Sequence, residues 1–294
     1  YRWLQSALPG GTVDRATFLW HGGFRPFGHP SQTVQLAASL SEVELEYQTG
    51  WPPGQLDAAL FVMSDRHLAA VASNVQVADS AVEALNVQMH IGRDEIEFEL
   101  NGQSEDSPVS LLNTLKQLPA LAVADSVMRD LTVGGDQPIA TMMTLAFDLR
   151  DITDTLDVAV DVDLSGARLE SELLDLAATE VSGMVRYRTR TGFDSDGLSA
   201  VVFGRPVAVT IGPQLATAPS TILAAEINTE VSVADLVSWR NIPATIPAEG
   251  TAAASVSVNV AKDISVNIRS DMQGVAVDLP LPWGKASATQ APLQ

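Results

Sequence analysis

The chain has 294 residues, and its 17 Lys and Arg against 36 Asp and Glu give a formal net charge of −19 at pH 7. This balance argues against a nucleic-acid-binding protein, because neutralising phosphates requires clustered Lys and Arg. Cysteine is absent, which excludes disulfides, thiolate metal sites and a cysteine nucleophile. Hydrophobic residues nevertheless make up 46% of the chain, so we expect a strongly polar outside around an unusually apolar inside.

Alternating apolar and polar residues run through most of the chain and predict strands with one solvated face. Three short amphipathic stretches interrupt them and predict helices. In chain order, we expect a helix at 3–8, strands around 42–47 and 95–100, a helix at 107–118, a strand at 156–162, a helix at 232–242 and a strand at 254–260. The second helix has the clearest signal, because Ser107 is suited to an N-cap, Pro108 to the first turn and Pro119 to the end.

A weak internal repeat is present at long spacing. The six residues that begin at Leu40 correspond to those that begin at Leu164 and at Met272, and similar helix, break and strand signals precede each copy. Such repeats predict an array of stacked units. We therefore expect residues 1–294 to form one continuous β structure of approximate units 1–105, 106–230 and 231–294, the last incomplete.

The alternation leaves open how the apolar face is covered. A β-sandwich or a closed barrel would bury it between two layers, whereas a sheet curled along its length would leave an open apolar trough. Aromatic residues are only 5% of the chain. A wall of Val, Leu, Ile, Ala and Met suits flexible acyl chains better than carbohydrates, which usually bind to aromatic platforms.

Several short motifs, in a specific order and spacing, cover nearly the whole length of the chain. They are Trp3-Leu4 with Ala7-Leu8 followed by Gly11-x-Val13-x-x-Ala16-x-x-Leu19-x-x-Gly22, Glu46-Tyr47-x-x-Gly50-Trp51-Pro52-Pro53, Leu164-Ser165-Gly166-x-x-Leu169, Val181-Ser182-Gly183-x-Val185-Arg186-Tyr187, Phe203-Gly204-Arg205-Pro206-Val207 and Ser270-Asp271-Met272-Gln273-Gly274-Val275-Ala276-Val277-Asp278-Leu279-Pro280. In these motifs the chain resembles the YhdP-type, AsmA-like proteins of the Gram-negative envelope.

The resemblance implies a long protein that is anchored in the inner membrane outside this segment and crosses the periplasm as a twisted β-groove. Phospholipid acyl chains would travel along the groove between the inner and outer membranes. The predicted fold is accordingly mainly β, an elongated antiparallel twisted sheet curled into an open hydrophobic groove with two or three short helices. The predicted function is a non-enzymatic lipid conduit, and the alternative is a structural or adhesion-type β-sandwich array that binds protein or glycan partners.

Alternation supplies the candidate groove residues, since the family has no fixed lipid-binding motif. They are Val43, Leu45, Leu60, Val62, Ile96, Phe98, Leu100, Leu145, Phe147, Val158, Val160, Val162, Val185, Tyr187, Val201, Phe203, Val207, Val209, Val256, Val258, Val260, Val266 and Ile268. We expect no catalytic residue and no cofactor. The leucines of 107–118 would pack on the sheet, where they could also cap or gate the trough.

One pattern matches the calcium loop of an EF-hand. Asp161, Asp163 and Glu172 have the required spacing, with a Ser165-Gly166 turn between them. An alternating segment leads into this loop where an EF-hand has a helix, so we favour a strand, a turn and a strand over a calcium site. His21, His29, His67 and His90 lack the sequence spacing of metal ligands, and we expect no metal site.

Overall fold

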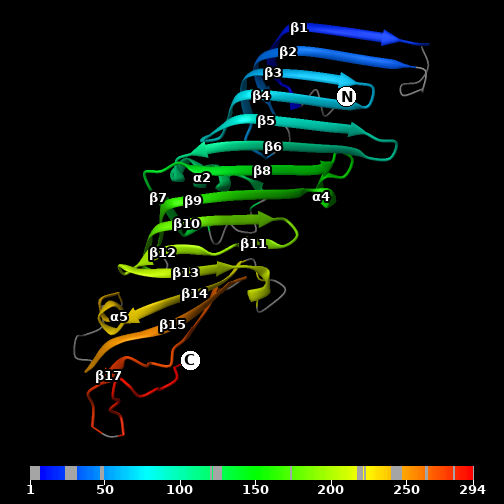
Figure 1. Ribbon diagram of the computed structural model, residues 1–294. Helices are drawn as coiled ribbons and strands as arrows, with labels where there is room; N and C mark the ends of the chain where they lie inside the picture. Colours follow the sequence, from blue (N-terminus) through cyan, green and yellow to red (C-terminus); the bar gives the residue numbers. More distant parts are fainter. Residues whose placement is uncertain are drawn as a thin grey trace. The chain divides into compact units, whose positions relative to one another are not determined.

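The computed structural model describes residues 7–23, 32–46, 50–119, 121, 128–172, 174–216, 221, 223–239, 247–261, 264–280 and 282–293. The chain is mainly β, with 64% strand, and forms one large antiparallel sheet that is not closed (Figure 1). The predicted fold class is thus confirmed. A sandwich of two packed sheets, the alternative that alternation left open, is not what these residues form.

The chain divides into two compact units. Unit 1 consists of residues 1–125, 138–162 and 187–190, and unit 2 consists of residues 126–137, 163–186 and 191–294. The three predicted repeats have other boundaries, and that division of the chain stays a prediction.

Unit 1 is a run of antiparallel strands in which each strand pairs with the next described strand of the unit, from β1 to β8. β9 lies beside β8 in Figure 1, and its first part belongs to the same unit. The strands are β1 (Gly10–His21), β2 (Thr33–Leu45), β3 (Gly54–Ser64), β4 (His67–Val77), β5 (Ser80–Ile91), β6 (Ile96–Asp106), β8 (Ile139–Asp148) and β9 (Asp157–Ser171).

Unit 2 continues the antiparallel pattern. Within it β7 pairs with β9, β10 with β9 and β12, and β12 to β16 pair in succession, while β17 pairs with β15. The strands are β7 (Leu131–Gly134), β10 (Leu176–Arg188), β11 (Gly192–Ser195), β12 (Leu198–Val202), β13 (Arg205–Ile211), β14 (Leu223–Ser232), β15 (Ala248–Val260), β16 (Ile264–Arg269) and β17 (Val275–Val277). A small core cluster of Leu198, Ile211 and Ala225 holds β12, β13 and β14 together.

The helices are short. α2 (Pro108–Lys116) begins as the sequence predicts, because the Ser107 side chain accepts a hydrogen bond from the Ser110 N–H and Pro108 occupies the first turn. α5 (Val233–Trp239) occupies the predicted stretch 232–242, and the Ser232 hydroxyl accepts from the Asp235 N–H. α4 (Ile152–Thr155) and a 3-10 turn, η2 (Pro213–Leu215), were not predicted. The helix predicted at 3–8 lies outside the described residues except for its last two.

The three copies of the repeat share a backbone feature. Glu42, Gly166 and Gly274 occupy the same position of the motif, and their φ angles are +51°, +71° and +97°. In each copy the next residue is apolar and buried: Val43, Ala167 and Val275 are 5%, 2% and 3% exposed. In β2 and β9 the motif is therefore a local irregularity within the strand, whereas Gly274 lies in the turn before β17; in each copy the positive φ precedes a buried apolar side chain.

The left-handed conformation predicts opposite effects of substitution at two of these positions. Glu42→Gly should raise the free energy of unfolding by about 0.5–1 kcal/mol, because glycine adopts positive φ without the steric cost of a Cβ. Gly166→Ala should lower it by about 1–2 kcal/mol through backbone conformation alone, since an added Cβ would meet no atom within 4 Å.

Urea denaturation measures both changes. The control is Glu44→Gly, two residues along β2 and also exposed, where φ is not positive and glycine should lower stability by about 0.5–1 kcal/mol. Equal effects of glycine at positions 42 and 44 would contradict this interpretation of the motif.

Candidate functional site

Apolar side chains of unit 1 form continuous rows that run across the strands. In an antiparallel sheet, directly paired residues point to the same face and lie about 4.5–5.5 Å apart, so the register identifies each row. One row is Leu36, Met63, Leu68, Met89, Phe98 and Phe147; the next is Ala38, Phe61, Ala70, Val87, Leu100 and Leu145; a third is Leu40, Ala59, Ala72, Leu85, Gly102 and Met143. Only the glycine in these rows lacks an apolar side chain.

A fourth row lies next to the third, but between the two rows the strands no longer alternate regularly between apolar and polar faces. We call this boundary between the third and fourth rows the line. Val43, Leu56, Val75 and Val82 are paired across β2 to β5, and each is three residues from a member of the third row rather than two. At this line Glu42 and Asn74 adopt positive φ, and a register shift separates Val82 from Ala84. The irregularity keeps apolar side chains on the same face on both sides of the line.

Two adjoining apolar cavities of about 100 and 70 Å³ lie over these rows. The first is lined by residues of β2 to β6, among them Val43, Leu56, Phe61 and Val87. The second is lined by residues of β4, β5, β6 and β8, and Val160 of β9 also lines it. Leu45 and Leu85 line both cavities. The two cavities therefore belong to one apolar groove, which we call the unit 1 groove.

α2 covers part of this groove. Leu111, Leu115 and Leu118, the apolar side of the helix segment, line the second cavity together with strand residues. Two polar contacts attach α2 to the start of β5 and the turn before it. The Ser80 hydroxyl donates to the Thr114 hydroxyl oxygen at 2.9 Å, and the Asn113 amide donates to the Asp79 carboxylate at 3.0 Å.

Seven of the thirteen predicted groove residues of unit 1 belong to these rows or line the cavities. Val43, Leu45, Phe98, Leu100, Leu145 and Val160 line the cavities. Phe147 stacks on Phe98 with the ring centroids 4.7 Å apart. Ile96 precedes Phe98 by two residues in β6 and is half-buried, as is Val162 of β9. Val158 and Tyr187 are buried, at 1% and 6% exposure.

Leu60 and Val62 are placed differently. The register puts them on the opposite face of β3 from Ala59 and Phe61, and they are 55% and 43% exposed. The sequence could not assign the face, because both faces of β3 carry apolar residues from Ala58 to Met63. The cavity-lining residues of β3 that sequence analysis missed are Gly54, Leu56, Ala59 and Phe61.

Seven of the ten predicted residues of unit 2 share one face of β13 to β16, because the register aligns Val207, Val209, Val256, Val258, Val260, Val266 and Ile268 on the same side of the sheet. Val185, Val209 and Val258 pack against the core cluster of Leu198, Ile211 and Ala225. Val207 and Val260 are buried, and Val256 pairs with Ile227 of β14 and Ile268 of β16. Val201 points to the face opposite its neighbour Ala200, which pairs with Val207. Phe203 lies in the turn between β12 and β13, and Phe203, Val266 and Ile268 are 42–48% exposed.

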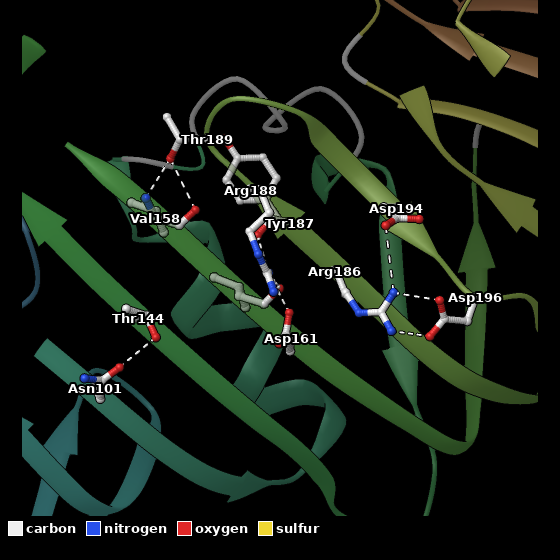
Figure 2. A network of polar contacts seen from close by, with 11 residues as sticks. Asn101, Thr144, Val158, Asp161, Arg186, Tyr187, Arg188, Thr189, Asp194 and Asp196 are labelled. Carbon is white, nitrogen blue, oxygen red and sulfur yellow. Dashed lines mark hydrogen bonds and ion pairs between the residues drawn. The ribbon is translucent and has the colours of Figure 1, made fainter. Parts of the chain in front are cut away.

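The residues of the calcium-like pattern lie in a strand, except Glu172, which is in the turn that follows it. Asp161, Asp163 and the Ser165-Gly166 pair are all within β9, which runs unbroken to Ser171. The Asp161 carboxylate is 2.5 Å from the Arg188 guanidinium, an ion pair drawn in Figure 2. Within the described part of the chain, no three His, Asp or Glu side chains are arranged to hold a metal ion.

Other polar contacts join side chains of neighbouring strands or turns within each unit. In unit 2, the Arg186 guanidinium donates to the Asp196 carboxylate and holds the pKa of that carboxyl below its usual value (Figure 2). In unit 1, the Thr144 hydroxyl donates to the Asn101 carbonyl oxygen at 2.7 Å. Burial raises the pKa of Tyr187 above its usual value, so this phenol stays neutral at physiological pH.

The whole sequence, residues 1–294, matches the family model described as YhdP protein. The chain belongs to the YhdP family. Membership of the YhdP family indicates a protein of the Gram-negative envelope with a role related to lipid transport. No curated protein and no solved structure matches the chain. No helix among the described residues of this YhdP-family chain is long and apolar enough to cross a membrane.

The packing of α2 against the groove predicts how much a buried leucine of this helix contributes to the free energy of unfolding of this YhdP-family chain. Leu111 is 6% exposed and lines the second cavity, so Leu111→Ala should lower the free energy of unfolding by about 2–4 kcal/mol. Leu112→Ala is the matched control, since Leu112 is only half-buried, and its loss should be clearly smaller. Urea denaturation of both variants measures the difference, and equal losses would mean that α2 is not packed through Leu111.

Proposed function

We propose that this chain is part of a non-enzymatic lipid conduit of the periplasm, in which the unit 1 groove binds the acyl chains of phospholipids. The observation that carries the proposal is the set of apolar rows that cross β2 to β8 in register. Membership of the YhdP family supports it, because that family belongs to the envelope and has a lipid-transport-related role.

The length of the rows suits an acyl chain. Each of the first three rows crosses six strands, β2 to β6 and β8, and at about 4.8 Å between strands this is about 24 Å. One leaflet contributes about 15 Å to the hydrocarbon core of a bilayer, half of the total of about 30 Å. A row is therefore long enough for an acyl chain to lie along it at full length.

The chemistry of the rows suits movement as well as binding. Each methylene group removed from water contributes about 0.8 kcal/mol, so a long acyl chain is held firmly by any part of the groove. The wall repeats Leu, Val, Met, Ala and Phe side chains from strand to strand, so a lipid that shifts by one strand exchanges one apolar contact for a similar one. Binding and a low barrier to sliding then coexist.

The polar part of a phospholipid would stay in water at the open side of the groove. The outward-facing strand residues carry much of the excess negative charge, as Glu97 and Glu99 do beside the buried Phe98 and Leu100. In this proposal phospholipid is the partner, nucleic acid is not, no step of chemistry is catalysed, and the membrane anchor of the full-length protein lies outside this segment.

Adjacent residues of β3 provide a direct test. Phe61 lines the groove and is half-buried, whereas Leu60 points to the other face. A photoreactive p-benzoylphenylalanine placed at position 61 should give phospholipid adducts on irradiation in cells, and the same residue at position 60 should give far fewer. The adducts are identified by mass spectrometry of the purified protein.

Substitution provides the complementary test. Phe61→Asp should remove most of the lipid that co-purifies with the chain, because a charge in the groove must be desolvated when an acyl chain passes. Leu60→Asp is the matched control on the solvated face and should leave the lipid content unchanged. Equal lipid adducts at positions 60 and 61, or full lipid content in a folded Phe61→Asp variant, would contradict the proposal.

A further inference from the structure

Two histidines stand directly opposite each other on the face of the sheet that does not line the groove. His67 opens β4, and its register partner in β5 is His90. The ring centroids are 4.5 Å apart, and the two Nδ1 atoms are 3.2 Å apart. His67 is exposed and His90 is half-buried, and both residues line an open hollow.

The separation of the two nitrogens suits a shared metal ion. Imidazole nitrogens bind Zn²⁺ at about 2.0–2.1 Å with tetrahedral geometry. Two nitrogens 3.2 Å apart that each lie about 2.05 Å from one ion subtend an angle of about 100° at it, close to the tetrahedral value. The distance between the two nitrogens is therefore compatible with bidentate binding, once the rings turn toward the ion and the Nδ1 proton that one donates to the other is lost.

The surroundings of the pair favour a cation. His67 and His90 line an open hollow of about 720 Å³ together with Glu95, Glu97, Glu99 and Asp148. Glu97 of β6 is the register partner of His90 and is exposed, so its carboxylate lies on the same face, one strand away. Arg190, Asp157 and four residues of the first apolar row also line the hollow: Leu68, Met89, Phe98 and Phe147. The Asp148 carboxylate accepts from the Ile96 and Arg150 N–H groups.

We propose that His67 and His90 bind one divalent transition-metal ion of the Zn²⁺, Ni²⁺ or Cu²⁺ class, with Glu97 and water completing its coordination. Imidazole is a preferred ligand of these three ions. The described residues supply no third side chain already in place, so Glu97 reaches the ion by a change of rotamer. The bound ion would link β4 to β5, and through Glu97 to β6, on the face away from the groove. The proposal does not rest on the proposed lipid conduit.

Titration calorimetry with ZnCl₂ on the whole chain tests the site. We expect one equivalent of Zn²⁺ to bind, and His67→Ala and His90→Ala each to weaken binding by at least about tenfold, since ligand and near-ligand substitutions cost about that much or more. His21→Ala is the matched control, because His21 is an exposed strand histidine whose register partner is Thr33. It should leave the affinity unchanged.

A second measurement needs no variant and covers the case in which a substitution disturbs folding. Titration of the wild-type chain with Ni²⁺ or Cu²⁺ should broaden the amide NMR signals of β4 and β5 around His67 and His90 before any others. Zn²⁺ binding that survives both histidine substitutions, no binding at millimolar Zn²⁺, or broadening centred elsewhere in the chain would each overturn the proposal.

Discussion

The groove of unit 1 depends on one constraint, the register that keeps apolar side chains of successive strands in line. Alternation along a single strand gives only a stripe about one residue wide. When seven strands from β1 to β8 are paired directly, the stripes join into rows, and the rows into a surface. A slip of one residue in any strand would place its polar side chains in the groove. The apolar surface therefore exists only in the observed register.

The fourth row shares a face with the third because the strands depart from regular geometry between them. Positive φ at Glu42 and Asn74, and the register shift near Val82, let the third and fourth rows face the same cavity although they are three residues apart. The same positive φ recurs at Gly166 and Gly274, each before a buried apolar residue. The irregularities thus belong to the design of the sheet in both units, and α2 adds a local cover at one part of the unit 1 groove.

Much of this could be predicted from the sequence, and the part that could not has a physical cause. Strong alternation and the Ser107-Pro108 cap carry local information, so the mainly-β class and α2 followed from them. The face of a side chain depends on pairing, which is not local: β3 is apolar on both faces, and Leu60 and Val62 were assigned to the groove in place of Ala59 and Phe61. Counting across Asn74, a residue that tolerates positive φ, would have revealed the change of phase in β4. His67 and His90 likewise lie opposite each other only because β4 pairs with β5. Their separation along the sequence does not reveal this.

In our proposal the apolar rows are a binding surface for lipid rather than an unusually large protein core. Native mass spectrometry of the chain purified from cells without harsh detergent distinguishes the two. We expect a folded protein that carries phospholipid masses, and that regains them after delipidation when it is incubated with phospholipid vesicles. A folded chain, verified by circular dichroism, that carries no lipid and takes up none from vesicles would contradict the proposal.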